Sequence, residues 1–122
     1  MHQLNSEHIF PSALSANNDG IVAIGGDLDP KRILQAYKQG IFPWFESDDY
    51  LVWWSPDPRM VLFPANLKIS KSTKKILKDG SFNVTFNQSF DQVVECCASV
   101  KRFGQNGTWI TDGLKKAYNL LH

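Results

Sequence analysis

Two prolines separated by one residue constrain the architecture of this chain more than any other feature. Pro56 and Pro58 lack a backbone donor, and each disfavours helical geometry in the residue before it. Neither a helix nor a central strand can therefore continue through residues 55–59. We place a boundary here and predict an amino-terminal α/β module over residues 1–58, followed by a second module over residues 59–122.

The first module is predicted to contain two strands and one helix. Residues 21–24 are an apolar run that ends in two glycines, which is typical of a buried strand followed by a sharp turn. A helix is expected to begin after Asp29, a good N-cap that is followed by proline, and to end at Gly40. Residues 51–54 have the composition of a second strand.

The second module is predicted to combine short strands with three helices. Strands are expected at residues 60–63, 67–69 and 82–86, the last because apolar and polar residues alternate there. Helices are expected to start at favourable N-caps, which are Ser70 or Ser72, Ser89 and Thr111. The last helix stops at residue 122 without a typical cap, so we expect an incomplete domain, with a natural end as the alternative.

The composition limits the classes to which the protein can belong. The chain has 122 residues, of which 43% are hydrophobic, and a net charge of +1, so any signal for nucleic-acid binding must come from local clusters. Cys96 and Cys97 are adjacent and the three histidines are scattered, which indicates neither a disulfide framework nor a zinc site. We expect a reduced, cytoplasmic setting, with no signal peptide and no membrane span.

Four lysines at helical spacing form the clearest functional pattern. They are Lys71, Lys74, Lys75 and Lys78. Their ammonium groups share one face of the predicted helix, opposite Ile76 and Leu77, and repel each other. A phosphate backbone would relieve this repulsion and release counterions, whereas lysine is too simple a point charge to read a base sequence. A solvated helix face explains the pattern equally well.

Aromatic residues form a second pattern. They are Phe42, Trp44, Phe45, Trp53, Trp54 and Trp109. Such side chains line apolar pockets or stack on bases, although most of them are expected to belong to the core. Trp44 and Trp109 are the better pocket candidates because each lies in an irregular segment. The sequence shows no Ser/His/Asp set, no pair of catalytic carboxylates and no metal cluster.

Seven strings of residues run in a distinctive order through nearly the whole chain. They are Gly25-Gly26-Asp27-Leu28, Ala36-Tyr37, Gly40-Ile41-Phe42-Pro43-Trp44-Phe45, Trp53-Trp54-Ser55-Pro56-Asp57-Pro58-Arg59, Gly107-Thr108-Trp109-Ile110-Thr111, Ala117-Tyr118 and Leu121-His122. Together they closely resemble the leucyl/phenylalanyl-tRNA–protein transferase family. The strings that contain Phe-Pro-Trp and Trp-Trp-Ser-Pro-Asp-Pro-Arg are long, and they make the resemblance specific.

The resemblance implies an aminoacyltransferase. Enzymes of this family move leucine or phenylalanine from its tRNA to the amino terminus of a protein that begins with lysine or arginine, which marks that protein for degradation by the N-end rule. The reaction is aminolysis of an activated ester, so no ATP, metal or other cofactor is implied. The implied fold is α/β, of the α+β type: a small amino-terminal α/β module followed by the first strands and helices of a truncated GNAT-like acyltransferase domain.

The resemblance also implies site residues. By motif position, Trp44 and Trp109 would hold the terminal adenosine of aminoacyl-tRNA, with Tyr37 and Tyr118 as weaker candidates. The basic helix that meets the tRNA acceptor stem would be the lysine helix, although Asp79 stands where a further basic residue is expected. The residues for proton handling would lie beyond the end of this chain. We therefore assign no catalytic residue and expect these 122 residues alone to show no transfer.

Two interpretations without catalysis remain open. A stand-alone RNA-binding module would grip phosphate through its lysines and would bind tRNA in a salt-dependent way, whatever amino acid is attached. A structural or partner-binding fragment would instead present its aromatic surface to another chain. Neither a membrane nor DNA is an expected partner.

Overall fold

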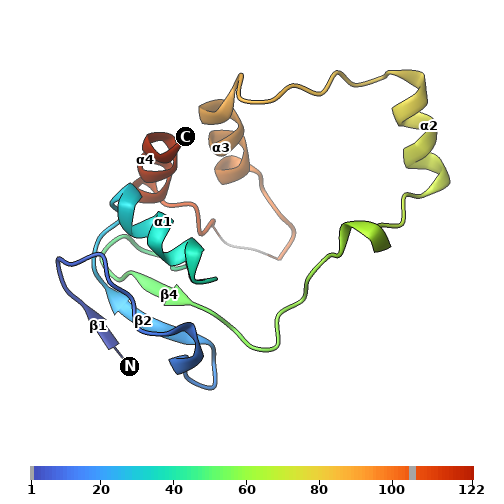
Figure 1. The fold of residues 1–122 in the computed structure, drawn as a ribbon. Helices are drawn as coiled ribbons and strands as arrows, with labels where there is room; N and C mark the ends of the chain where they lie inside the picture. The colour runs from blue at the N-terminus through green and yellow to red at the C-terminus, as the bar shows by residue number, and fades with distance from the viewer. Residues whose placement is uncertain (1, 105–106) are drawn as a thin grey trace. The chain divides into compact units, whose positions relative to one another are not determined.

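The computed structural model describes residues 2–104 and 107–122 and has four strands and four α-helices (Figure 1). The structure is therefore of the α+β class, as predicted. The chain divides into two compact units, one formed by Met1–Asp57 with Phe90–His122 and the other by Pro58–Ser89. The domain boundary expected between residues 58 and 59 stays a prediction. Residues 90–122 pack with residues 1–57, but packing in one compact unit does not show to which domain they belong.

The strands described in the first unit form one mixed sheet in the order β1-β2-β4-β3. Strand β1 (His2–Leu4) pairs in parallel with β2 (Ile21–Gly25), and β2 pairs in antiparallel fashion with β4 (Val52–Trp54). Strand β3 (Phe42–Pro43) adds to β4 in antiparallel fashion and lies at an edge of the sheet. Proline is tolerated in an edge strand, because its missing N–H would otherwise be needed for a hydrogen bond to a strand on the outer side.

The sheet confirms two predicted strands and contains two further strands that the pattern of apolar and polar residues did not indicate. Strands β2 and β4 confirm the predictions for residues 21–24 and 51–54. Strand β1 has only three residues, two of them exposed, and β3 has only two residues. Neither is long enough to show an alternation of apolar and polar positions. Their pairing with β2 and β4 defines them instead.

Helix α1 (Pro30–Lys38) begins where its cap predicts. The Asp29 carboxylate accepts a hydrogen bond from the backbone N–H of Lys31 at 2.7 Å, and Pro30 occupies the first turn. Gly40 adopts a φ of 72° just after the helix, so the chain can turn back towards β3. The helix buries Ile33 and Ala36 completely.

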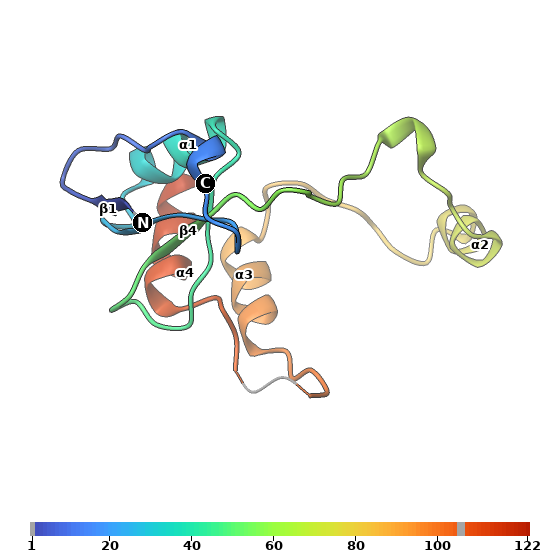
Figure 2. The same cartoon turned by 90° about the horizontal axis from the view of Figure 1, so that it is seen from below.

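Helices α1 and α4 (Asp112–Leu121) pack against the sheet (Figure 2). The main core cluster combines α1, α4, β2 and β4, and its buried members are Phe10, Val22, Ala23, Ile33, Ala36, Ile41, Trp53 and Ala117. Trp53 is fully buried, and its indole N–H donates to the carbonyl of Gly25 at 2.9 Å. The Phe10 ring meets the Trp53 ring edge-on at 4.8 Å. A single indole thus links the core to the end of β2.

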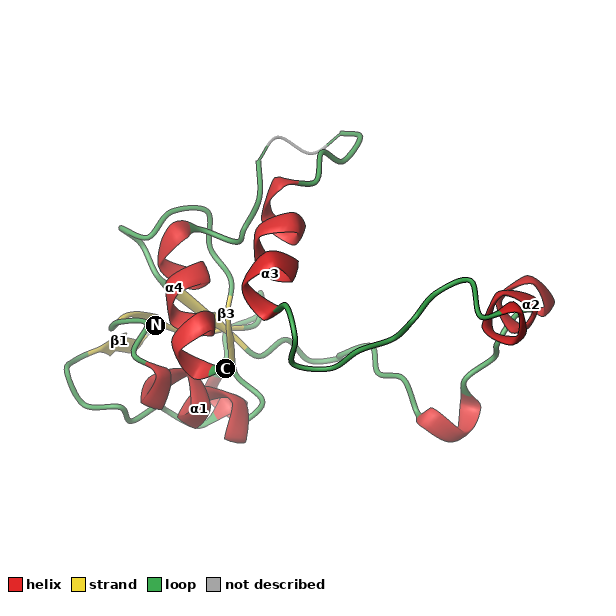
Figure 3. Cartoon of the chain, turned by 90° about the horizontal axis from the view of Figure 1, so that it is seen from above, coloured by secondary structure: helices red, strands yellow, loops and turns green. Residues whose placement is uncertain are grey.

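Helix α3 (Phe90–Ser99) begins directly after Ser89, as predicted, and lies beside α4 (Figure 3). Its apolar face is only partly covered: Val94 is half-buried, whereas Val93 is 57% exposed. The Phe90 ring stacks on the imidazole of His122 with centroids 4.3 Å apart. The Lys115 ammonium of α4 reaches the Glu95 carboxylate of α3 at 3.0 Å.

The second unit contains α2 (Lys71–Asp79) and a short 3-10 turn, Pro64–Asn66. The Ser70 hydroxyl caps α2 by accepting from the N–H of Thr73 at 3.1 Å, and Gly80 ends the helix with a left-handed φ of 62°. Both ends of this helix confirm the prediction.

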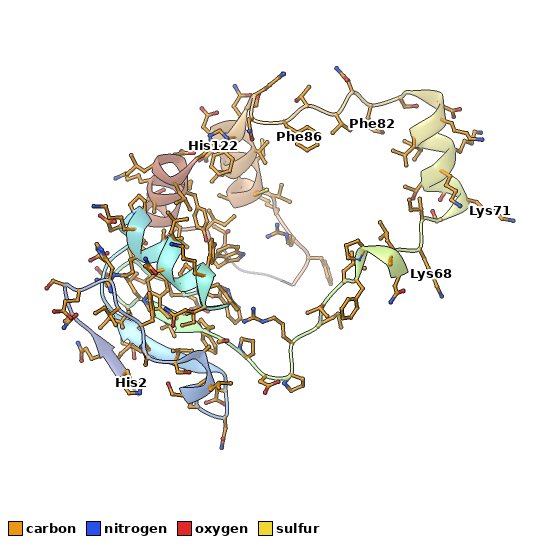
Figure 4. All side chains as sticks on the ribbon, in the orientation of Figure 1. His2, Lys68, Lys71, Phe82, Phe86 and His122 are labelled. Atoms are coloured by element: carbon orange, nitrogen blue, oxygen red, sulfur yellow. The ribbon has the colours of Figure 1, made fainter. Side chains whose placement is uncertain are left out.

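The strands expected at residues 60–63, 67–69 and 82–86 are wrong. The structure has no strand in this unit, all of whose residues it describes. Figure 4 marks Phe82 and Phe86 on the segment after α2, and their side chains are 77% and 82% exposed. A strand requires a neighbour that completes its backbone hydrogen bonds, and none is present within Pro58–Ser89. Alternation of apolar residues is therefore not sufficient for a strand here.

Several expectations concern features other than helices and strands. Cys96 and Cys97 are free, exposed thiols. The polar loop expected at residues 102–107 includes positions 105 and 106, which lie outside the described residues. No helix in the part of the chain that the structure describes has both the length and the apolar character needed to traverse a bilayer.

Candidate functional site

Trp44 follows edge strand β3 and is held by its backbone. Its N–H donates to the carbonyl of Val52 at 3.0 Å, and its carbonyl accepts from the indole N–H of Trp54 at 2.6 Å. The two indole rings are tilted against each other with centroids 5.5 Å apart. The backbone is thus anchored on β4 while the Trp44 side chain remains 50% exposed.

Trp109 lies in the short segment that leads into α4. Its carbonyl accepts from the N–H of Thr111 at 3.1 Å, and the Thr108 hydroxyl accepts from the N–H of Ile110 at 3.1 Å. These two turn-like bonds fold the segment tightly. The Trp109 side chain is 38% exposed, so a large part of the indole surface is open to a ligand.

The two tryptophans line the same cleft. It has a volume of about 810 Å³, and its other lining residues are Phe45, Glu46, Trp54, Gly107 and Thr108. The volume lies within the range of about 300–1,000 Å³ that is typical of small-molecule sites. Three indoles offer flat stacking surfaces, and the Glu46 carboxylate and the Thr108 hydroxyl offer polar contacts. Such a cleft suits a planar heteroaromatic group that carries hydrogen-bonding substituents.

A smaller apolar cavity lies behind Trp109, between α3 and α4. It measures about 180 Å³, and its lining includes Phe90, Val94, Cys97, Leu114 and Tyr118. Trp109 contributes to this cavity as well as to the cleft. Its indole therefore forms a wall shared by two spaces.

Tyr37 and Tyr118 contact each other rather than the cleft. The hydroxyl of Tyr37 on α1 shares a hydrogen bond with the hydroxyl of Tyr118 on α4, and the ring centroids are 6.4 Å apart. Burial, followed by the hydrogen bond to Tyr37, raises the pKa of the Tyr118 phenol. Tyr118 borders the apolar cavity, whereas the residues around the cleft include neither tyrosine. The structure thus brings together two of the four aromatic candidates at the cleft.

The four candidate lysines are all exposed on α2. Figure 4 shows the Lys71 side chain extending from the start of this helix. Ile76 and Leu77 are 45% and 62% exposed, so the other side of α2 is also uncovered within its unit. The lysines therefore form an accessible row of positive charge, which suits contacts with phosphate groups.

The cleft includes three residues that sequence reasoning did not single out as binding residues: Glu46, Trp54 and Thr108. For Trp54 a signal was present. Successive residues of a strand point to opposite faces, so a buried Trp53 on β4 places Trp54 on the other side. For Glu46 and Thr108 no periodicity was available, because both lie in irregular segments.

Across residues 2–104 and 107–122 no group of three His, Cys, Asp or Glu side chains is arranged to hold a metal ion. The polar groups described at the cleft are a carboxylate and a hydroxyl, next to three indoles.

Comparison with known proteins identifies two family models that match this chain. Residues 26–57 match the model of the leucyl/phenylalanyl-tRNA protein transferase N-terminal domain, and residues 61–122 match the leucyl/phenylalanyl-tRNA protein transferase model. The first match contains Trp44 and Trp54, and the second contains Trp109 and the lysines of α2.

Individual proteins named leucyl/phenylalanyl-tRNA–protein transferase are also similar. The one from Christiangramia forsetii is 50% identical over 122 residues, which cover 100% of this chain and 58% of the relative. The one from Flavobacterium johnsoniae is 51% identical, with the same coverage of both chains. The one from Syntrophobacter fumaroxidans is 49% identical over 120 residues, 98% of this chain and 51% of the relative. The chain thus spans between 51% and 58% of the length of these relatives.

The two family models together account for most of the chain, and the second alone covers half of it. This chain belongs to the leucyl/phenylalanyl-tRNA–protein transferase family.

Proposed function

We propose that this chain supplies the nucleotide-binding part of an aminoacyltransferase. The enzyme would move leucine or phenylalanine from aminoacyl-tRNA to the amino terminus of cytoplasmic proteins that begin with lysine or arginine, in the N-end rule pathway. The observation that carries the proposal is the shared cleft of Trp44 and Trp109, two residues that come from different, non-consecutive segments of the chain. The names of the relatives support the same activity.

Within the cleft, the terminal adenosine of the tRNA would stack on the two indoles. Every base has a π-face, and a stacked base contributes about 1–3 kcal/mol to binding. The Glu46 carboxylate accepts hydrogen bonds only, so it suits an amino group of the ligand. The cleft would fix the position of the aminoacyl ester, and a fixed ester favours attack by an amine placed next to it.

The lysine face of α2 would hold the acceptor stem. Four exposed ammonium groups on one helix supply sequence-independent attraction to phosphates and lose strength as salt rises. This interaction would bind any tRNA. The aminoacyl ester and the side chain of the attached amino acid would be recognised by other residues. Asp79 at the end of α2 lowers the positive charge of the helix.

The chemistry itself would need groups outside these 122 residues. Aminolysis needs a group that removes a proton from the amine and donors that stabilise the oxyanion. We propose that a GNAT-like domain, of which residues 59–122 form the beginning, supplies them, and that these 122 residues alone catalyse no transfer. No cofactor is required, because the ester of aminoacyl-tRNA is already activated.

A transfer assay tests the proposal. The full-length polypeptide from the natural reading frame is incubated with [14C]Phe-tRNA and a peptide that begins with arginine, and transfer of label to the peptide is measured. We expect transfer by the wild type and an increase of about ten- to a hundredfold in KM for Phe-tRNA in W44A and W109A, as expected for the loss of one stacked base. Tyr50, which is 56% exposed and lies outside the cleft lining, offers a matched control: Y50A should behave like the wild type.

Two outcomes would contradict the proposal. Full-length wild type that transfers no label to the arginine peptide would exclude the activity. Unchanged kinetics in both tryptophan variants would exclude the cleft as the nucleotide site. A peptide that begins with aspartate serves as the acceptor control, and its labelling at the same rate would exclude the proposed preference for a basic amino terminus.

The non-catalytic RNA-binding module is the alternative interpretation, and it would use the same exposed lysines of α2. It predicts equal affinity for charged and uncharged tRNA and equal affinity in W44A and the wild type. The transferase predicts weaker binding of Phe-tRNA by W44A. A filter-binding titration with both tRNA forms separates the two.

A further inference from the structure

The carboxylate of Asp48 joins the two segments that carry the cleft tryptophans. Asp48 lies in the loop between β3 and β4, shortly after Trp44. One carboxylate oxygen accepts from the hydroxyl of Thr111, which follows Trp109 closely in the chain. The other accepts from the backbone N–H of Gly113 at 2.9 Å. A single side chain therefore joins the loop after Trp44 to the residues that follow Trp109 at the start of α4.

The Thr111 hydroxyl takes part in two bonds at once. It donates to Asp48 and accepts from the N–H of Leu114 at 3.2 Å, as the N-cap of α4. Asp48 and Thr111 together thus satisfy donors of the first turn of α4. A carboxylate at the amino end of a helix is also favoured by the helix dipole. The bridge is therefore attached to a rigid element rather than to another loop.

Gly113 shows how closely the loop approaches the helix. A Cβ at this position would lie 2.6 Å from one carboxylate oxygen of Asp48 and 2.7 Å from its carboxyl carbon. Any side chain at residue 113 would displace the carboxylate. The close approach of Asp48 gives a physical reason for a glycine in α4.

We propose that Asp48 is a positioning residue that sets the separation of Trp44 and Trp109 for the bound nucleotide. This inference rests on the proposed function, because it assigns to Asp48 the geometry of the nucleotide site. Asp48 is not among the residues that line the cleft, so it would act through the two indoles and not by contact with the ligand. When the bridge is broken, the loop and the start of α4 sample several separations. If the separation that permits binding is populated about a tenth of the time, the affinity for the nucleotide falls about tenfold.

Ligand binding by full-length protein tests the inference. The probe is phenylalanyl-adenosine with a non-hydrolysable 3′-amide, and the readout is quenching of tryptophan fluorescence. We expect D48A and G113A each to raise Kd about tenfold. The double variant should be no weaker than D48A, because the two changes break the same contact. D48N should recover most of the affinity, because its amide oxygen can accept from Gly113 and its amino group can donate to Thr111.

Matched controls separate positioning from general damage. D49A removes a negative charge from the same loop, and among the described residues Asp49 bonds to Ser47 within that loop, so Kd should stay within twofold of the wild type. G113A introduces a good helix former but also breaks the contact of Asp48 with the first turn of α4, so its loss of affinity is interpreted together with the recovery in D48N. W44A and W109A are titrated in parallel as variants of the nucleotide site itself.

The pattern of results identifies which claim fails. Wild-type affinity in both D48A and G113A, with weak binding by W44A and W109A, would overturn the positioning role and leave the nucleotide site in place. A wild-type protein that does not bind the probe would overturn both. Weak binding by D48A and G113A with recovery in D48N, next to an unaffected D49A, is the result expected for a bridge.

Discussion

The guanidinium of Arg32, which is fully buried, is paired with the carboxylate of Asp27. Its Nε donates to one carboxylate oxygen at 2.9 Å and its Nη2 to the other at 3.0 Å. Its remaining bonds go to the carbonyls of Glu7 at 2.9 Å and Asn5 at 2.7 Å. The side chain therefore links α1 to the turn after β2 and to the segment after β1.

This pair explains the glycine turn near the start of the chain. A Cβ on Gly26 would lie 3.1 Å from the central carbon of the Arg32 guanidinium, and Gly26 also has a φ of 78°. Both the backbone conformation and the space thus favour glycine. The sequence suggested a plain turn and a helix cap here. The Asp29 cap is confirmed, and the ion pair is an additional feature that the pattern did not reveal.

Replacing Arg32 by methionine should destabilise the protein. The change leaves two backbone carbonyls without their donor and removes the charged partner of the Asp27 carboxylate, and we expect a loss of about 2–4 kcal/mol in the free energy of unfolding. Urea denaturation measures it. The exposed neighbour Lys31 supplies the control, since K31M should change stability by less than about 0.5 kcal/mol. Equal effects of the two variants would show that the buried pair does not stabilise the fold.

Stability should fall on the acid side because of Asp27. The hydrogen bond from Arg32 lowers the pKa of this carboxyl below its ordinary value of 3.8. A lowered folded-state pKa gives a stabilisation that is fully present above the unfolded value and is lost as pH falls through the folded one. D27N should flatten the acid limb of a plot of stability against pH. An acid limb that is as steep in D27N as in the wild type would contradict this.

The Tyr37–Tyr118 pair should be visible in an alkaline titration. Burial and the bond to Tyr37 raise the pKa of Tyr118, so its phenolate should form only after ordinary tyrosines have ionised near pH 10. The stabilisation from this raised pKa is present below pH 10 and is lost at higher pH. Y118F should remove the late step of phenolate absorbance and cost about 1 kcal/mol at neutral pH. Identical titration curves for Y118F and wild type would refute the assignment.

The α2 lysines should determine how tRNA binding responds to salt. For each lysine that contacts a phosphate, replacement by alanine should lower the slope of log K against log salt by about 0.7–0.9. K74A should show this loss in a filter-binding series with the full-length protein. Lys38, an exposed lysine on α1, provides the matched control. A slope that is unchanged in K71A, K74A, K75A and K78A would show that this helix does not meet the RNA.

Local features of the sequence predicted the helices well. Asp29, Ser70 and Thr111 each accept from a backbone N–H of the first turn that follows, and Gly80 ends α2 in the left-handed conformation that glycine favours. Such signals act within a few residues, so the sequence contains all the information that they need. The strands at residues 60–63, 67–69 and 82–86 needed distant partners, and there the pattern was misleading.

The residues of the candidate site also include some that the sequence suggested and some that it did not. Motif position and irregular surroundings suggested Trp44 and Trp109, and the structure places both on one cleft. Tyr37 and Tyr118 were suggested on weaker grounds, and the structure pairs them with each other instead. Glu46 and Thr108 enter the cleft only because two loops meet, and no spacing along the chain records that meeting.

The helix ends, the α+β class, the lysine face of α2 and the family could all be predicted from the amino-acid sequence, because each depends on neighbouring residues or on strings that can be matched directly. Three features became visible in the folded chain: Arg32 is buried on Asp27, β1 and β3 are strands, and Asp48 reaches the first turn of α4. These contacts join residues that are remote along the chain. Their free energy depends on burial and on partners that exist only once the chain has folded.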